Sequence, residues 1–578
     1  MIKSFAVVGL GLAIQGAFSA STADAQTASQ ITPPSYRPPL ENNAGRGLSV
    51  PRSHGPAPPA GAEKLFVQLS GISVEGGFDA LAEATRALEA KLTGRRVSGS
   101  EIFAAPRELE AAYASAGYVL ARVVLPPQAL NDGGRLKLVV IDGFIEKIEV
   151  KDVPGLVRTR ILDLLTPLSN KPHLTLAEIE RRVLLAGDTP GVDLHSTLSP
   201  GTVPGATILT IDGKHRPFGG LLSLDNTLGA PFGRWTLGLG LDINSIGSLG
   251  ELIYLRANGD PNFGSNGFAS SHPRNRALAV GFVLPIGIDG LSLNMEATDA
   301  RTAPIPNAGF STPDVFQRVS VRVRYPWIRS RNLDFNTEIS LDIEDDTQSL
   351  VLNETAAPLY DDRLRVFRVA GDGDWISPWG GIFTGRAVVS FGVDALGARS
   401  AAAASPLRPL SRQGADADFQ KGEIWLTYSQ LLIDHLGLDL FARAQSSFGQ
   451  AMSRSEQIGI ATTTGLSSFD AGTLQGDSGI VLRAELDSPW SLPIAPDIGN
   501  AVASPYVFGA LGELFLQDPT AVEPARTKAA SYGLGLRLNG ILQGPMSNAL
   551  LSLEWGRQAE SIAPHEGQRF TLVASGKF

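Results

Sequence analysis

The sequence contains no cysteine, and only 19% of its 578 residues are charged. The absence of cysteine excludes disulfides, thiolate zinc sites and a cysteine nucleophile. The low charge content is unusual for a soluble globular chain, yet the mean hydropathy of +0.05 is too low for a helical membrane protein. A net charge of −9 gives no reason to expect nucleic acid as a partner.

Residues 1–25 have the organisation of a secretory signal peptide. Lys3 supplies a basic start, residues 5–18 are apolar, and Ala23-Asp24-Ala25 has the small-x-small form that signal peptidase cleaves. The alternative is a membrane anchor, but the apolar run is too short and polar residues follow it. We therefore predict export and a mature chain that begins at Gln26. No later apolar run is long enough for a spanning helix.

Residues 26–62 form a linker rich in proline, glycine, serine and asparagine. Such a segment cannot bury a core, so we expect it to be extended or disordered. Residues 63–143 and 144–212 then repeat a similar order of strand and helix patterns at about 75 residues, which predicts two small α+β modules in tandem. The first should have helices over 78–92 and 106–116. In the second, Thr175 and Glu178 form a capping box that opens a helix.

From residue 213 to residue 578 the helical pattern disappears and strict alternation replaces it. Val319, Val321 and Val323, for example, alternate with Ser320, Arg322 and Arg324. We count about sixteen such segments, spaced by about 20 to 25 residues, which is typical of a transmembrane β-barrel. A soluble sandwich or barrel is the alternative, with its polar face outside. The alternating apolar or small residues up to the terminal Phe578 favour the outer membrane.

Gly476-Asp477-Ser478-Gly479 has the form of a chymotrypsin-like nucleophile motif. That chemistry needs a histidine base and a buried aspartate, whereas the seven histidines are scattered without a supporting motif. We interpret Gly476, Asp477 and Gly479 as the turn into a strand, and predict no enzymatic activity, no cofactor and no metal.

Two further charged groups have alternative explanations. The acidic clusters Glu344-Asp345-Asp346 and Asp361-Asp362 could bind calcium, but they lack the spacing of a calcium loop, so we expect solvated loop ends. Arg318, Arg322 and Arg324 could contact a translocating chain, or could pair with acids across a lumen, and we favour pairing.

Specific motifs accompany this organisation. The first module carries Gly117-Tyr118, Arg122, Leu125-Pro126-Pro127-Gln128, Gly134 and a run from Val139 to Ile145 in which Asp142 stands where a glutamate is usual; the second carries Asp188-Thr189-Pro190-Gly191-Val192, Leu198-Ser199-Pro200-Gly201 and Pro204-Gly205. Over residues 64–578 the chain resembles the two-partner secretion transporters (TpsB, the haemolysin secretion/activation proteins), whose modules are called POTRA domains.

The resemblance implies two periplasmic POTRA modules and an outer-membrane barrel of about sixteen strands in a Gram-negative bacterium. It implies that the partner is an exoprotein, secreted in unfolded form through a barrel surrounded by outer-membrane lipid. Substrate capture is then expected at Tyr118, Arg122, Pro126 and Gln128. The alternative is a non-secreting channel or a barrel-assembly factor.

The resemblance also implies that the loop at 447–476 folds back into the lumen. In the family its tip reads V-R-G-Y/F, and the arginine meets an aspartate of an F-x-D-x-G motif on the barrel wall. Here the tip carries Ser467, Ser468 and Phe469, and the facing wall carries Phe508, Ala510 and Gly512. Both charged partners are absent together. Losing one would leave a buried charge uncompensated at about 3–5 kcal/mol, whereas losing both can be nearly neutral.

Some relatives place an amphipathic plug helix before the first POTRA module. Residues 26–62 lack helical periodicity, so we predict no plug helix in this chain.

Overall fold

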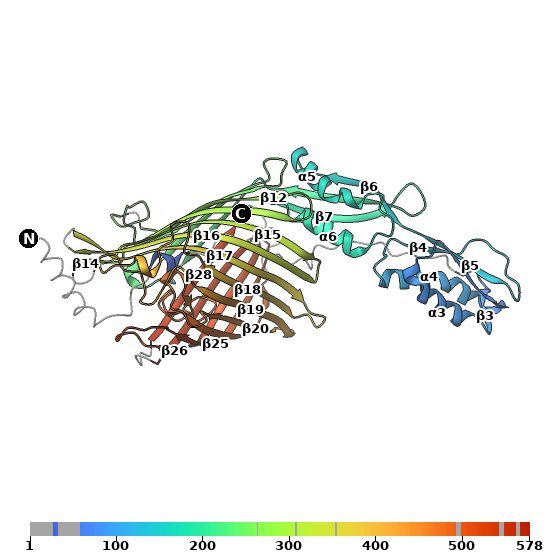
Figure 1. The fold of residues 1–578 in the computed structure, drawn as a ribbon. Helices are drawn as coiled ribbons and strands as arrows, with labels where there is room; N and C mark the ends of the chain where they lie inside the picture. Colours follow the sequence, from blue (N-terminus) through green and yellow to red (C-terminus); the bar gives the residue numbers. More distant parts are fainter. Residues whose placement is uncertain are drawn as a thin grey trace, which may run out of the picture.

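The structure, a computed structural model, describes residues 27–32, 58–262, 264–306, 309–352, 355–492, 499–542, 548–561 and 567–578. The predicted signal peptide lies outside these residues. Figure 1 shows two α+β modules arranged in a row beyond one end of a closed β-barrel. Within the described ranges, no helix combines the length and apolar character that a membrane crossing requires.

We call the first module POTRA1 and the second POTRA2, after the domains that they resemble. POTRA1 packs two helices against two small sheets. Its elements are η3 (Ala62–Lys64), β1 (Phe66–Gln68), β2 (Gly71–Glu75), η4 (Asp79–Leu81), α3 (Ala82–Leu92), β3 (Arg96–Ser98), α4 (Gly99–Ser115), β4 (Arg122–Val124) and β5 (Arg135–Ile141). The sheets have the orders β1-β3 and β2-β5-β4. Helix α4 begins seven residues before the predicted Pro106, because Ser98 and Glu101 form a capping box that the sequence prediction missed.

The second module, POTRA2, covers a three-stranded sheet of order β6-β8-β7 with two helices. Its elements are β6 (Phe144–Lys151), α5 (Gly155–Leu165), η5 (Thr166–Leu168), α6 (Leu176–Gly187), β7 (Val192–Pro200) and β8 (Ala206–His215). Thr175 and Glu178 form the predicted capping box at the start of α6. Fully buried Ile161, Ile179 and Leu209 join helices and sheet in one core.

The barrel has sixteen long antiparallel strands and two short ones, β14 and β24, which confirms the predicted fold class. The long strands are β9 (Phe218–Asp225), β10 (Thr236–Asn244), β11 (Leu252–Gly259), β12 (Asn275–Ile286), β13 (Leu291–Thr302), β15 (Asp314–Arg329), β16 (Leu333–Leu352), β17 (Thr355–Ile376), β18 (Ile382–Gly392), β19 (Gln420–Ile433), β20 (Leu436–Ser446), β23 (Ser478–Asp487), β25 (Gly499–Phe515), β26 (Arg526–Leu542), β27 (Asn548–Glu560) and β28 (Gly567–Lys577). The short strands are β14 (Phe310–Ser311) and β24 (Trp490–Leu492). Pairing of β28 with β9 closes the barrel.

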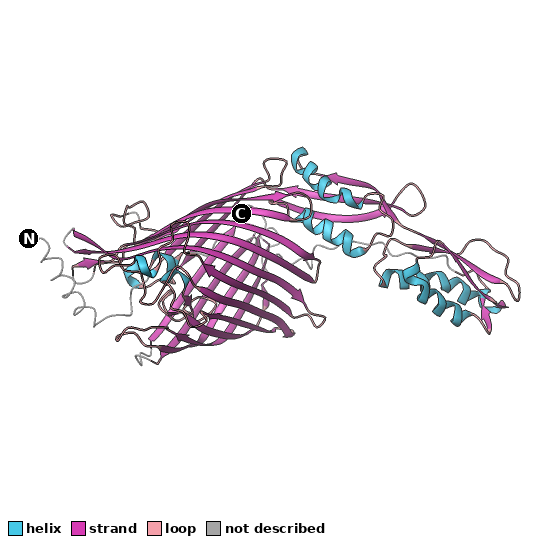
Figure 2. Ribbon diagram, viewed as in Figure 1, coloured by secondary structure: helices cyan, strands magenta, loops and turns pink. Residues whose placement is uncertain are grey.

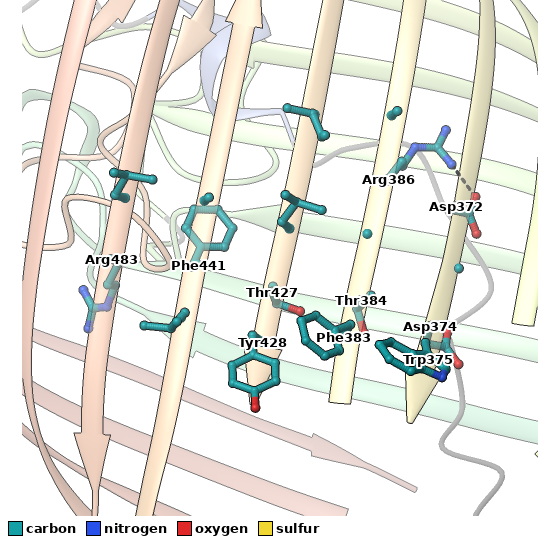
Figure 3. A pocket seen from close by; sticks show the side chains of 18 of the residues that line it. Asp372, Asp374, Trp375, Phe383, Thr384, Arg386, Thr427, Tyr428, Phe441 and Arg483 are labelled. Carbon is teal, nitrogen blue, oxygen red and sulfur yellow. Dashed lines mark hydrogen bonds and ion pairs between the residues drawn. The ribbon is translucent and has the colours of Figure 1, made fainter. Parts of the chain in front are cut away.

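Alternation along each strand separates an apolar outer face from a polar lumen. On β15, Val319 is 45% exposed while Ser320 is fully buried, as expected when lipid surrounds a barrel whose lumen is filled. Figure 3 shows Trp375, Phe383 and Tyr428 side by side near the ends of β17, β18 and β19, with ring centroids 5.3 and 4.4 Å apart along the row. Aromatic side chains at this position are typical of a membrane interface.

Of residues 26–62, in which we predict no amphipathic plug helix, residues 33–57 lie outside the described part of the chain, and a single short turn is found at the start. Ala28–Ile31 form the one-turn helix α2, capped by Thr27 and Gln30, and Figures 1 and 2 show it at the end of the barrel away from the modules. Ala28 is fully buried in a cluster of small and aromatic side chains from the lumenal wall, namely Ala277, Ala300 and Phe316. A single turn is too short to show periodicity, so only this packing reveals it.

Four of the five acids in Glu344-Asp345-Asp346 and Asp361-Asp362, which we expected at solvated loop ends, are buried, whereas the side chain of Asp345 is 47% exposed. Asp346 and Asp362 are each 1% exposed and lie opposite each other on β16 and β17. Both side chains face the lumen. We expected a loop at these positions, but β16 and β17 continue through them as part of the barrel wall. By contrast, the predicted pairing of lumenal arginines is confirmed, since Arg324 contacts Asp372 at 2.5 Å and Arg318 and Arg322 each approach Glu296 at 3.5 Å.

Candidate functional site: a loop held inside the barrel

The segment between β20 and β23 returns into the lumen. It contains η8 (Arg454–Glu456) and a small hairpin of β21 (Ile458–Gly459) and β22 (Gln475–Gly476). Most of its residues are buried, and the tip residues Ser467 and Ser468 are 5% and 2% exposed. We call residues 460–474 the lumenal tip segment. Its one charged residue is Asp470.

Asp477 holds both ends of the loop together. Its Oδ1 accepts from the backbone N–H of Met452 at 3.0 Å and from Nε2 of Gln457 at 2.9 Å, while Oδ2 accepts from the N–H of Gln517 at 2.7 Å. A fully buried carboxylate needs such partners. Gly476 ends β22, and Gly479 lies in β23 and so is not in the predicted turn.

The environment of Ser478 is that of a strand-start residue. Its hydroxyl accepts from the backbone N–H of Ser447 at 2.9 Å and lies 3.1 Å from the Ser447 hydroxyl. Within the described residues it makes no other hydrogen bond. The motif that resembles a nucleophile therefore closes the base of the loop.

A buried ion pair cluster fixes the first part of the loop to the wall. Glu456 lies 2.6 Å from Arg368 on β17 and 2.7 Å from Lys421 on β19. Its side chain is 1% exposed, and a buried carboxylate is stable only where cations such as these compensate its charge.

The tip segment makes an apolar contact with the wall that the resemblance pointed to. Leu466 and Phe469 pack in one buried cluster with Ala510 and Leu514 of β25. Small wall residues allow this approach. A Cβ atom on Gly512 would lie 2.7 Å from Cδ1 of Ile460, and one on Gly556 of β27 would lie 2.1 Å from Oγ of Ser468.

A charged pair lies beneath the tip, formed by residues the sequence analysis did not select. Arg483 of β23 donates from Nη2 to Oε2 of Glu554 of β27 at 2.5 Å. The Ser467 hydroxyl accepts from Nη1 of Arg483 at 2.6 Å and donates to Oε1 of Glu554. The tip hydroxyl therefore bridges both members of the pair.

Other wall groups support the same two side chains. Nε of Arg483 donates to Glu485 at 2.7 Å, and its guanidinium lies 3.9 Å from the ring centroid of Phe508. The Tyr506 hydroxyl donates to Oε2 of Glu554 at 2.9 Å. Predicted Phe508 is therefore the aromatic platform of the arginine.

Further hydrogen bonds attach the tip to β26 and β28. The backbone N–H of Ser468 donates to Ser531 at 3.2 Å, and the two hydroxyls are 2.6 Å apart. Thr571 donates to the carbonyl of Ser467 at 3.3 Å. Asp470 forms an ion pair with Arg569 in which the aspartate side chain is 37% exposed.

Sequence reasoning missed Arg483 and Glu554 because the resemblance pointed to positions 467 and 510 alone. A signal was present, since Arg483 lies on the charged face of the alternating strand that begins at Ser478. Strand register places Arg483 directly opposite Ala510. A cation from the wall therefore occupies the neighbourhood where the family places a cation from the loop.

The four predicted capture residues do not converge on one site. Arg122 donates to its own module's carbonyls at Val119 and Ala121, both at 3.0 Å. Gln128 bonds both the N–H and the carbonyl of Lys137, at 2.9 and 2.8 Å, and its amide also reaches the carbonyl of Pro126 at 3.3 Å. These contacts hold the segment around β4 and β5 within POTRA1.

Tyr118 lies at the joint between the modules. Its ring packs edge-on against Phe78 at 5.0 Å, and His173 of POTRA2 packs against the same phenylalanine at 4.2 Å. The N–H of Leu176 donates to the carbonyl of Gly117 at 2.8 Å. This pair of contacts connects POTRA1 to the start of helix α6.

POTRA2 is docked on the turns at the near end of the barrel. Arg329 donates to both carboxylate oxygens of Asp188, at 2.5 and 3.0 Å, and Arg331 contacts Glu180 at 3.1 Å. Beside this contact lies a cavity of about 570 Å³. Its lining includes Asp193 and Lys214 from POTRA2 and Arg324, Asn336 and Phe578 from the barrel.

Comparison with known proteins follows the same division of the chain. The family model described as haemolysin secretion/activation protein ShlB/FhaC/HecB matches residues 205–538, and the ShlB-type POTRA domain model matches residues 67–143. The chain is 25% identical over 459 residues to the hemolysin transporter protein ShlB of Serratia marcescens, covering 77% of each chain.

Two further similarities are more limited. The chain is 27% identical over 164 residues to the heme/hemopexin transporter protein HuxB of Haemophilus influenzae, covering 28% of this chain and 29% of that protein. Its fold is similar to that of CdiB from Escherichia coli, with a TM-score of 0.68 and 19% identity over 91% of this chain and 93% of the other.

Proposed function

The chain belongs to the haemolysin secretion/activation protein family ShlB/FhaC/HecB, and we propose that it exports its partner in unfolded form along a route from POTRA2 through the barrel lumen. As a member of that family it is an outer-membrane transporter that secretes a partner exoprotein. Its barrel lies in the outer membrane, and its POTRA domains lie in the periplasm.

The entry of this route is the edge of β7. In the described residues β7 pairs with β8 alone, so its second edge is unpaired. Asp193, His195 and Thr197 project from its exposed face. An extended chain can add to such an edge through main-chain hydrogen bonds. Because residues 192–193 line the cavity at the barrel mouth, a captured segment would already lie at the entrance.

The observation that carries this proposal is the junction between POTRA2 and the barrel. Strand β8 ends at His215 and β9 begins at Phe218, so little chain separates the module from the wall. The ion pair of Asp188 with Arg329 adds a direct contact across the junction. The module is therefore held where a chain bound to it can enter the lumen.

Passage requires the lumen to be cleared. Helix α2 and the lumenal tip segment both occupy it, and both are held by noncovalent contacts. We propose that Ser467, Ser468 and Phe469, against Phe508, Ala510 and Gly512, form the gate contact. The family resemblance implies that folding of the substrate outside the cell drives its transport.

The test of secretion compares culture supernatants of a wild-type strain, a strain lacking the gene, and the deletion strain complemented with the intact gene. We expect one or a few large exoproteins to be lost in the deletion and restored on complementation. An exoproteome that does not change between the three strains would contradict the proposed function.

The test of the entry route uses a proline at His195, which would disrupt hydrogen bonding along β7, and a matched His195→Ala variant. Secretion should fall with the proline and persist with the alanine. Both barrels should assemble normally, as judged by heat-modifiable electrophoretic mobility. Equal secretion by the two variants would exclude β7 as the capture edge.

A further inference from the structure

We infer that Arg483 and Glu554 are positioning residues that hold the lumenal tip segment, and that they do so as a charge pair belonging wholly to the barrel wall. This inference rests on the proposed gating role of the loop for its biological meaning, although the contact itself does not depend on secretion. In this protein the charged residues that hold the tip would therefore lie in the barrel wall, since the tip lacks the arginine usual in the family.

The pair is complete without the loop. Arg483 contacts Glu554 at 2.5 Å and Glu485 at 2.7 Å, and Glu554 also accepts from Tyr506 at 2.9 Å. All four residues lie on β23, β25 or β27. When the tip leaves, both charges therefore keep a charged or hydrogen-bonded partner in the wall.

The tip contributes uncharged groups to this contact. From Arg483, Nη1 donates to the Ser467 hydroxyl at 2.6 Å and to the Gly465 carbonyl at 3.2 Å. The Ser467 hydroxyl in turn donates to Glu554. Hydrogen bonds to charged groups are stronger than those between neutral groups, so these contacts favour retention of the tip in its buried site.

This arrangement determines what release costs. A lock made from a loop cation and a wall anion would leave two uncompensated charges when the loop departs, which is expensive in a buried site. Here release breaks hydrogen bonds of neutral loop groups and separates only one charged pair of the tip segment, Asp470 with Arg569. The aspartate of that pair is 37% exposed, so solvent can replace its partner.

The experiment uses the absence of cysteine. Ala461 is 1% exposed within the loop cluster, and its carbonyl accepts from the backbone N–H of Gly472 in the same segment at 3.4 Å, a bond that a cysteine side chain leaves in place. In an Ala461→Cys reporter chain, reconstituted without any secretion partner, the rate of maleimide labelling measures how often the tip leaves. This readout is independent of secretion, so failure of the proposed function would not alter it.

We expect Ser467→Ala to raise the labelling rate at least about tenfold, which corresponds to about 1.4 kcal/mol of lost retention. Thr473→Ala is the matched control, because its hydroxyl bonds to the carbonyl of Asp470 within the same loop. The control should label at the reporter's original rate. Equal rates for Ser467→Ala and Thr473→Ala in folded barrels would overturn the inference.

The paired change Arg483→Gln with Glu554→Gln removes both charges together and should also raise labelling. Adding Ser467→Ala to it should produce no further tenfold change, because the hydroxyl has lost its charged partners. A full additional increase would show that Ser467 acts independently of the pair and would contradict the inference.

The salt dependence of the labelling rate tests the same inference without the paired change, and so applies even if that variant does not fold. In an Asp470→Asn reporter chain, labelling should be nearly the same at low and high salt, because no remaining charge pair of the tip separates. A labelling rate that rises steeply with salt would mean that release does separate charges, which would refute a wall-held pair.

Discussion

At the scale of single residues, Ser467 shows how a missing charge changes a contact without removing it. The tip still contacts the barrel wall, because the Ser467 hydroxyl accepts a hydrogen bond from Arg483 at 2.6 Å. Here the guanidinium in this contact belongs to Arg483 of β23, whereas in the family it belongs to an arginine of the loop. Ala510 lies directly opposite that arginine, where an aspartate would face a cation from the same wall.

Replacing Ser467 with arginine should therefore expel the tip. The new guanidinium would lie against Arg483 in a buried site, where like charges repel strongly. We expect Ser467→Arg to raise labelling of the Ala461→Cys reporter by more than tenfold.

Adding Ala510→Asp should reverse much of that change, because the aspartate would lie between the two cations. The comparison is the reporter chain with Ala510→Asp alone. If the single Ser467→Arg chain retains its tip as well as the double variant, positions 467 and 510 do not share the contact region described here.

At the scale of elements, the loop is attached at three separate places along its length. Asp477 closes its base, Glu456 fixes its first part, and the hydroxyls of Ser467 and Ser468 hold its tip. The base and first part are held by buried charges, whereas the tip is held mainly by neutral groups. Movement of the tip alone is therefore the least costly rearrangement of this element.

A disulfide between loop and wall should stop that movement. The hydroxyls of Ser468 and Ser531 are 2.6 Å apart and both residues are buried, so Ser468→Cys with Ser531→Cys places two thiols within bonding range. The periplasm oxidises such pairs. We expect secretion to fall to background and to recover on addition of reductant.

Each single-cysteine variant is the matched control for the paired one and should secrete normally with or without reductant. Electrophoresis before and after reduction should reveal the cross-link in the double variant. Normal secretion by a fully cross-linked protein would show that the tip stays in place during transport.

At the scale of the whole molecule, the two modules and the barrel are connected by successive joints. Tyr118 and His173 pack on Phe78 between the modules, and Asp188 and Glu180 bond to arginines of the barrel turns. The motif residue Asp188 therefore has a docking role that can be tested separately from capture.

Loosening the second joint should reduce secretion while leaving the barrel stable. In Asp188→Ala with Glu180→Ala, Arg329 keeps its contact with Asp334 at 2.5 Å, so its charge stays compensated. We expect a several-fold loss of secretion and unchanged heat-modifiable mobility. Glu83→Ala, which removes an exposed carboxylate from α3 of POTRA1, is the control. Equal secretion by all three chains would mean that docking is not required.

The architecture of this protein could be predicted from local patterns in its chain. Alternation with period two must appear wherever one face of a strand meets lipid and the other a polar lumen, so sixteen strands could be counted from residues such as Val319 and Ser320. The start of helix α6 followed from a local signal, the capping box of Thr175 and Glu178. These properties depend on neighbours in the chain.

Contacts between side chains across the lumen could not be predicted in this way and became visible in the folded barrel. Arg483 and Glu554 are 71 positions apart and are joined by strand register and barrel closure. The burial of Ala28, Asp346 and Asp362 likewise depends on distant walls that surround them. The alternating pattern can show whether a strand residue faces the lumen or the lipid. Predicting which residues meet across a closed barrel requires the positions of all the strands between them.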